Sequence, residues 1–369
     1  MSRCFFGYFN NLTKEECRIM RGWAIIAIVL HNYCHKLPLA STENEFVWVF
    51  DHTQYFFHHF ADSLFINIFS FWGHYGVPIF VFLSGYGLAM KYEKCNGGRI
   101  SIKRFILSHY KKLTTMMLLG LMAYYLYCWV ISDTFTMNDH FWLRLAAMLT
   151  YTINLIPFGY FPVEPGPYWY FMLTMELYVI YIFLLHKNGN LPLFLLCFIS
   201  IIAFGVFEGQ GKMILWMKLN LFGASIPFSL GILAGRSNLK AKSYESSSRT
   251  GTYGLLMLVS LPILIVSELH FYTWLFTSIA VLVFGISLSR LSKGVVGKAV
   301  GWIGGVSNII FVVHPIIREL YLGEYGIKPA SPFIGLLSYI AITLVIASVI
   351  KYRIQVLHIV QKIVQNPDL

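Results

Sequence analysis

Long apolar runs separated by short polar connections restrict what this chain can fold into. A bilayer core of about 30 Å is spanned by roughly 20 helical residues. Mean hydropathy is +0.63 and only 12% of the residues are charged, about half the roughly 25% of soluble domains. We therefore expect an all-α polytopic membrane protein, a single transmembrane domain over residues 1–369. About ten transmembrane helices are predicted, at 19–36, 64–90, 113–131, 168–186, 191–207, 219–235, 252–267, 271–289, 300–320 and 332–350.

Positive charge predicts the orientation of these helices. The chain has 28 Lys and Arg against 17 Asp and Glu, and Lys/Arg-rich loops stay in the cytoplasm. Most of the positive charges lie in the two terminal segments and in the connections on the same side, with residues 91–112 the richest. We therefore expect both termini in the cytoplasm. No basic block with interleaved aromatic residues stands apart, so no nucleic-acid partner is predicted. The six cysteines are scattered, which indicates neither a disulfide framework nor a zinc knuckle.

Several ionisable side chains lie inside the predicted spans. His31 is near the middle of the first span, and His35 is one turn farther out on the same helical face. Glu176, His314 and Arg318 lie at comparable depths in two other spans. Intramembrane ionisable groups usually face a bundle interior or a watery cavity. These five residues therefore predict a reaction centre or a substrate pathway.

Four sequence patches, in order along the chain, resemble integral-membrane acyltransferase family 3. This family contains bacterial enzymes related to those that O-acetylate cell-surface glycans. The first patch, an arginine followed by an aliphatic run and a histidine, is similar to the signature of the family's first helix. The patches are "RGWAIIAIVLHNYCH", "GVPIFVFLSGYGLAMKY", "YWYFMLTMELYVIY" and "IGGVSNIIFVVHP".

The resemblance implies a catalytic histidine on the first helix. His31 is the first candidate, but nine residues separate it from Arg21 where the family commonly has ten, so His35 stays an alternative. Histidine suits this role because its ordinary pKa of about 6.5 lets it accept a hydroxyl proton. Glu176, at a position where the family more often has glutamine, and His314 are the other catalytic candidates. The substrate-binding candidates are Arg21, His35, Ser84, Tyr86, Trp169, Arg318, Arg18, Arg104 and Lys111.

The implied function is membrane O-acyltransfer, either direct or through an acyl-enzyme. The donor substrate would be cytosolic acyl-CoA, most simply acetyl-CoA, with no permanently bound cofactor. The acceptor would be a hydroxyl of a glycan or glycolipid at the outer face of the bacterial inner membrane. The alternative is a proton-coupled permease that uses the same His and Glu residues. No inverted repeat is visible in the sequence, which disfavours a carrier.

The outward histidines also raise the question of a metal site. Three of them follow the first span, and together with its two histidines they could form a ligand set. Metal-binding histidines usually come with carboxylate or further histidine ligands and with partners that orient them. Only two carboxylates accompany these histidines, so we expect no metal. These histidines are His52, His58 and His59, and the carboxylates are Asp51 and Asp62.

Overall fold

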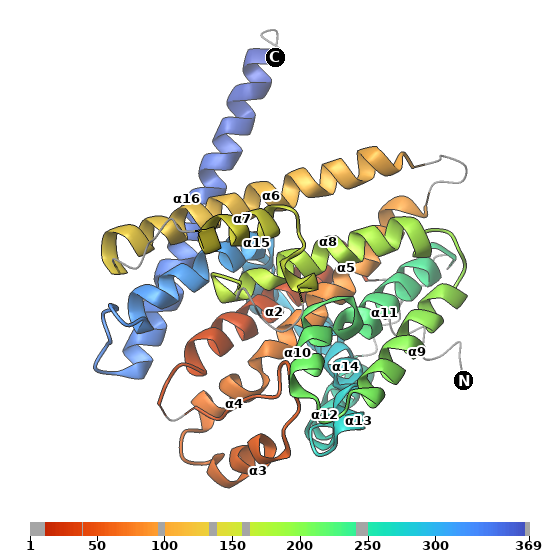
Figure 1. Cartoon of the computed structure of the whole chain (residues 1–369), viewed down its shortest axis with the longest axis horizontal. Helices are drawn as coiled ribbons and strands as arrows, with labels where there is room; N and C mark the ends of the chain where they lie inside the picture. Colours follow the sequence, from red (N-terminus) through yellow and green to blue (C-terminus); the bar gives the residue numbers. More distant parts are fainter. Residues whose placement is uncertain are drawn as a thin grey trace.

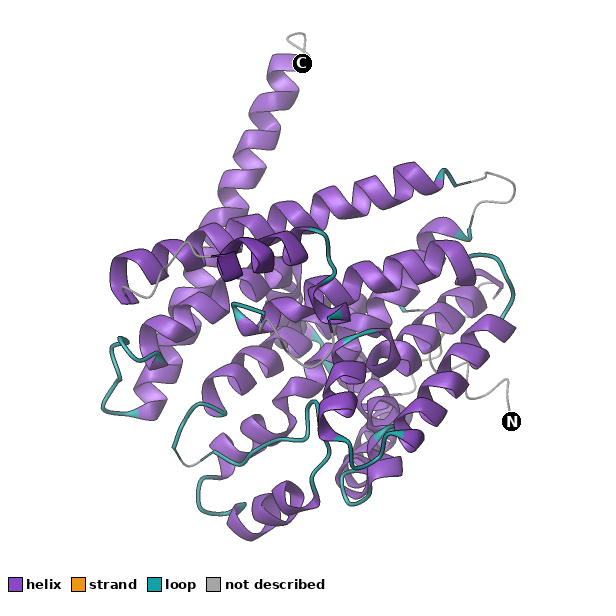
Figure 2. Ribbon diagram, viewed as in Figure 1, coloured by secondary structure: helices purple, strands orange, loops and turns teal. Residues whose placement is uncertain are grey.

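The computed structural model describes residues 12–38, 40–94, 100–132, 139–156, 163–240 and 250–365. The described residues form helices joined by loops, and none of them forms a strand (Figures 1 and 2). The α-helices are α2 (Lys14–Cys34), α3 (Phe50–His59), α4 (Leu64–Trp72), α5 (Gly76–Tyr92), α6 (Ile102–Tyr127), α7 (Asp139–Leu149), α8 (Trp169–Ile180), α9 (Leu191–Val206), α10 (Gly211–Leu219), α11 (Leu221–Lys240), α12 (Thr250–Ser267), α13 (Phe271–Trp274), α14 (Thr277–Leu291), α15 (Gly294–Leu322) and α16 (Pro332–Gln365).

All ten predicted spans fall on helical segments. Within the described ranges, six helices are long and apolar enough to cross a membrane, or seven if α10 and α11, bent by 41° at their junction, form one broken span. The helices α9 and α14 are apolar but shorter. The chain is therefore a multi-pass membrane protein. The count of ten spans and the cytoplasmic position of both termini stay predictions.

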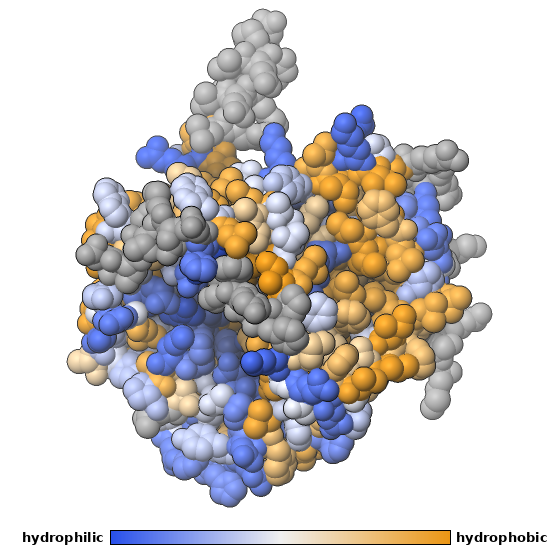
Figure 3. Space-filling view, viewed as in Figure 1, coloured by the Kyte–Doolittle hydropathy of each residue, from blue (hydrophilic) through white to orange (hydrophobic). Residues whose placement is uncertain are grey.

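The outer surface of the bundle agrees with a lipid environment. Figure 3 shows apolar side chains over much of one face, beside a hydrophilic hollow. On α6, Leu119, Met122 and Leu126 are exposed by half or more of their surface. Contiguous apolar surface of this kind marks a membrane contact or a partner. The first half of α16 packs on α15, and its C-terminal part extends away from the rest of the bundle (Figure 1).

The helix α2 lies at the centre of the bundle, where it packs on α15 and α5. It starts with a capping box, in which the Thr13 side chain accepts from the Glu16 backbone N–H and the Glu16 carboxylate accepts from the Thr13 backbone N–H. Two glycines allow α2 and α15 to approach closely: a Cβ on Gly22 would lie 2.1 Å from the Val300 carbonyl oxygen, and one on Gly304 would lie 1.8 Å from the Arg18 carbonyl oxygen. Small residues at helix crossings are typical of membrane bundles.

Replacing Gly22 with alanine is therefore expected to destabilise the bundle. The added methyl group must push α15 away from α2, and such overpacking typically costs about 1–3 kcal/mol. Gly87→Ala, on α5, is the matched control because its Cβ would meet no atom within 4 Å. The thermal unfolding midpoint in detergent should fall for Gly22→Ala and stay level or rise for Gly87→Ala. Equal midpoints for the two variants would contradict close packing at this crossing.

Candidate active site

A cavity of ≈ 360 Å³ opens beside α2. Its walls come from the second half of α2, the segment after it, the 3₁₀ turn Gly73–Tyr75, the start of α8, and α15. Four of the predicted site residues line it: His31, His35, Trp169 and Arg318. The cavity therefore brings together predicted site residues from three predicted spans.

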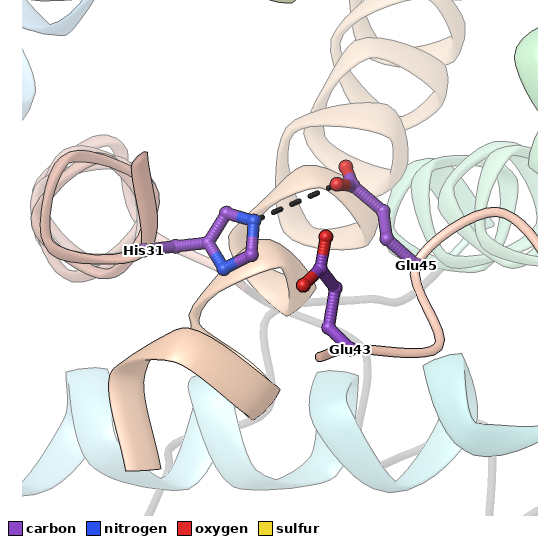
Figure 4. A group of neighbouring side chains, drawn as sticks. All are labelled: His31, Glu43 and Glu45. Atoms are coloured by element: carbon purple, nitrogen blue, oxygen red, sulfur yellow. Dashed lines mark ion pairs between the residues drawn. The ribbon is translucent and has the colours of Figure 1, made fainter. Parts of the chain in front are cut away.

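The imidazole of His31 is held in one orientation. The side chain is 3% exposed, and Nδ1 lies 2.9 Å from the Ser70 carbonyl oxygen and 3.2 Å from that of Phe69. Since a carbonyl oxygen can only accept a hydrogen bond, Nδ1 carries the proton and donates it. When the ring is neutral, Nε2 is therefore the nitrogen with the lone pair. It points to the Glu45 carboxylate, with 3.6 Å between Nε2 and Oε2 (Figure 4). This is the tautomer that a general base requires.

Two carboxylates, Glu43 and Glu45, stand opposite His31 on the segment that follows α2 (Figure 4). One ligand atom from each of the three side chains lies within 4.8 Å of the others. Burial raises the pKa of Glu43, while the nearby His31 acts in the opposite direction. The sequence analysis missed both glutamates because they lie in a polar connection, where a charge is ordinary. The available signal was the "ENE" triplet soon after the histidine-bearing span.

Asn44 fixes the segment that carries these two carboxylates. Its side chain is fully buried, and Nδ2 donates to Thr53 Oγ1 at 3.0 Å and to Glu268 Oε2 at 3.4 Å. Its Oδ1 accepts from the Val49 backbone N–H at 3.0 Å, and its carbonyl oxygen accepts from Trp274 Nε1 at 2.9 Å. Asn44 thus ties the loop to α3, to the end of α12 and to α13. The flanking glutamates are held in place as a consequence.

The buried Glu268, which accepts a hydrogen bond from Asn44, continues this network toward another wall of the cavity. Its carboxylate accepts from the Tyr75 hydroxyl as well as from Asn44. Burial raises the pKa of Glu268 to about 7, although both of these hydrogen bonds act to lower it. Tyr75 ends the turn that contains His74, a second histidine of the cavity wall. The hydrogen bonds between Asn44, Glu268 and Tyr75 therefore connect two walls of the cavity.

Asn44→Ala is expected to weaken activity without removing any group that lines the cavity. The variant loses side-chain hydrogen bonds to four partners, Thr53, Glu268, Val49 and His52, and each such loss at a buried site costs about 1–3 kcal/mol. We expect a lower thermal unfolding midpoint and an acyl-transfer rate reduced by roughly tenfold or more, since small misplacements of reacting groups are costly. Asn188→Ala is the control because that exposed amide bonds only to Leu184 in its own turn. A wild-type rate for Asn44→Ala would contradict the anchoring role.

The other predicted residues at the cavity have defined partners. His35 Nδ1 donates to the His31 carbonyl oxygen at 2.8 Å, and the two imidazole rings stack with centroids 4.8 Å apart. Arg318 donates to Asn32 Oδ1 at 3.0 Å, and its guanidinium also pairs with its neighbour Glu319 at 2.6 Å. Both His31 and the next residue, Asn32, line the cavity.

Glu176 and His314 do not line the cavity. Glu176 Oε2 accepts from the Leu221 backbone N–H at 3.0 Å, so this carboxylate binds the first residue of α11 at the break after α10. His314 is fully buried in α15, where Nδ1 donates to the Ile310 carbonyl oxygen at 3.0 Å. Their predicted catalytic roles stay predictions, and the contacts of Glu176 fit a helix-capping role.

The remaining binding candidates do not line the cavity. Arg21 Nε donates to the Cys17 carbonyl oxygen at 3.3 Å, and Ser84 Oγ donates to that of Phe80 at 2.9 Å. Tyr86 donates to the Leu12 carbonyl oxygen at 3.0 Å and accepts from Asn238. Three more are exposed basic residues, which the structure does not bring into the cavity: Arg18, Arg104 and Lys111. None of these six forms part of the cavity lining.

The chain was compared with known protein families, curated proteins and solved structures. A family model described as an acyltransferase domain matches residues 16–352. No curated protein and no solved structure matches the chain. The match spans all four motif patches and nearly the whole helical bundle, which confirms the resemblance. The chain therefore belongs to the membrane acyltransferase family 3, the family of this acyltransferase domain.

Proposed function

We propose that this protein transfers an acetyl group from cytosolic acetyl-CoA to a hydroxyl of a glycan or glycolipid at the outer face of the bacterial inner membrane. The observation that supports it best is the His31 imidazole, whose Nδ1–H donates to the Ser70 carbonyl oxygen while Nε2 faces the cavity and the Glu45 carboxylate. Family membership favours this enzyme over the permease that intramembrane His and Glu residues also suit.

The proposed chemistry is general-base catalysis by His31. Nε2 takes the proton of the acceptor hydroxyl as its oxygen attacks the thioester carbonyl carbon. The tetrahedral intermediate then collapses, the C–S bond breaks, and the CoA sulfur leaves with the proton that the imidazolium returns. Glu45, with its carboxylate 3.6 Å from Nε2, stabilises the positive charge that develops on the ring. Arg318 lines the same cavity and can donate a hydrogen bond to the oxyanion.

The walls of the cavity suit a sugar as the acceptor. Phe46 and Trp169 form an aromatic corner, with ring centroids 5.4 Å apart at 80°, which can pack against the apolar face of a sugar ring. The carboxylates of Glu43 and Glu45 can accept hydrogen bonds from its hydroxyls. The volume of ≈ 360 Å³ is in the range of small-molecule sites, about 300–1,000 Å³. One sugar unit of a longer acceptor fits this description.

The donor is proposed to bind at the inward side, where Arg18, Arg21, Arg104 and Lys111 can contact CoA phosphates. Arg21→Ala should weaken acetyl-CoA binding by about 1.5–3 kcal/mol, the scale of a hydrogen bond to a charged group. Arg21→Lys should restore only part of the affinity, because an ammonium group cannot bind two phosphate oxygens at once. Arg353→Ala, an exposed arginine on α16, is the control. An unchanged dissociation constant for Arg21→Ala would mean that Arg21 does not contact the donor.

The proposal is tested with purified protein and acetyl-CoA labelled in the acetyl group. Membranes that contain the native acceptor should gain label in a glycan or glycolipid fraction, with one CoA released for each acetyl transferred. His31→Gln protein serves as the control for spontaneous acetylation. Substrate movement across liposomes without any release of CoA would support the permease and overturn the enzyme.

A further inference from the structure

We infer that His31, Glu43 and Glu45 form a binding site for a divalent transition-metal ion of the Zn²⁺ class, with His74 as the fourth ligand, and that its occupancy switches the enzyme off. The binding step stands without the proposed function, whereas the inhibition rests on it. No metal was predicted from the sequence, where only Asp51 and Asp62 accompany the outward histidines. The structure supplies two further carboxylates on the segment after α2 (Figure 4).

The ligand atoms already converge. One atom from each side chain lies within 4.8 Å of the other two, and the closest pair, His31 Nε2 and Glu45 Oε2, is 3.6 Å apart. Zn²⁺ binds nitrogen and carboxylate oxygen at about 2.0–2.2 Å, so its tetrahedral ligands stand roughly 3.4 Å apart. Small rotations of the two glutamate side chains bridge the difference. His31 itself need not move.

Three basic side chains lie near this group without pairing directly with its carboxylates among the described contacts: Lys36 and Arg318 of the cavity wall, and the partly buried Lys218. In the described part of the chain, no Lys or Arg forms an ion pair with either glutamate. Arg318, which lines the same cavity, is paired with Glu319. Two partly buried carboxylates that lack a direct ion pair with Lys or Arg can attract a cation.

The surroundings of the group also fit a metal site. Metal-ligating histidines usually donate their second ring N–H to a carbonyl or carboxylate, and His31 Nδ1 does so to Ser70. His74 is the independent observation. It is 5% exposed, it lines the cavity, and within the described part of the chain neither ring nitrogen has a hydrogen-bond partner of normal geometry. Its ring stands edge-on to that of His31, with centroids 5.5 Å apart. The converging group contains His31, Glu43 and Glu45 but not His74, so His74 would complete the coordination by moving its buried imidazole toward the ion.

Metal occupancy and catalysis exclude each other at this site. The lone pair of His31 Nε2 either binds the ion or takes the hydroxyl proton. A bound ion also occupies the two carboxylates that face the acceptor. Zn²⁺ should therefore inhibit acetyl transfer at the concentrations at which it fills the site.

The test measures metal binding directly. Purified full-length protein in detergent is dialysed against a series of free Zn²⁺ concentrations, with metal content measured by mass spectrometry. We expect one Zn²⁺ per chain that is lost or weakened by at least roughly tenfold in Glu43→Gln, Glu45→Gln and His74→Ala. His59→Gln is the matched control, because His59 forms an exposed pair with Asp62 at 2.8 Å and should not affect this ion. Mg²⁺, which prefers oxygen ligands and keeps its waters, should not compete.

Each outcome decides the inference. Loss of Zn²⁺ in the three cavity variants but not in His59→Gln supports the site. Retention in the cavity variants with loss in His59→Gln assigns the ion to the surface pair and overturns it, as does the absence of any bound Zn²⁺. The inhibition constant for acetyl transfer should equal the Zn²⁺ dissociation constant. If the protein binds Zn²⁺ as expected but transfers no acetyl group, the metal site stands and the proposed function fails.

Discussion

His31→Gln is expected to reduce acetyl transfer by roughly 10²–10⁴-fold while leaving acetyl-CoA affinity and thermal stability nearly unchanged. Gln retains hydrogen-bonding capacity and much of the volume but cannot take a proton. Since proton removal is needed in the transition state and not for donor binding, kcat should fall far more than the donor KM changes. The wild-type rate should also fall as pH drops, because a protonated imidazole cannot accept the hydroxyl proton.

His35→Ala distinguishes the two candidate bases on α2. The His35 ring stacks on His31 and donates Nδ1–H to the His31 carbonyl oxygen, so its loss should cause a smaller decrease in rate. His58→Gln, an exposed histidine of α3, is the control for histidine loss in general. If His35→Ala were inactive while His31→Gln still turned over, the base would lie one turn farther out.

The helices could be predicted from the sequence because apolar runs are local. Every one of the ten predicted spans falls on helix, since a backbone in hydrocarbon must satisfy its own hydrogen bonds. The number of crossings is harder to predict. The helix α2 carries the catalytic candidate, yet it is not among the apolar helices long enough to span. Charges near its start and histidines near its end lower its apolarity.

The site could be predicted only in part. His31, His35, Trp169 and Arg318 were found because an ionisable or aromatic residue within an apolar motif is conspicuous. Glu43, Asn44 and Glu45 were missed, because only folding of the loop back onto α2 brings these polar residues to His31.

Glu176 shows the opposite difficulty. A carboxylate in the middle of an apolar run predicts function, but this one binds the backbone N–H of Leu221. This N–H is free because the chain bends by 41° at Asn220, between α10 and α11. The bend is a feature of the tertiary structure. A helix end inside the bundle needs an acceptor for its free N–H groups, and a distant segment of the chain provides it.

Glu45→Gln is expected to reduce kcat by roughly 10²–10³-fold, the cost of losing one preorganised electrostatic contact. The amide has the same shape but no charge, so the imidazolium formed at Nε2, 3.6 Å away, loses its counter-charge. The tautomer should survive, because the Ser70 carbonyl oxygen holds the Nδ1 proton independently of Glu45. This predicts a variant with normal folding and normal donor affinity but a slow chemical step. Glu43→Gln should reduce kcat less, since the Glu43 carboxylate forms no ion pair with His31 among the described contacts. Glu324 is an exposed glutamate after α15, and Glu324→Gln should leave kcat unchanged. Steady-state rates for the three variants at one pH test whether Glu45 stabilises the imidazolium. An unchanged kcat for Glu45→Gln would show that other groups in the cavity stabilise this charge.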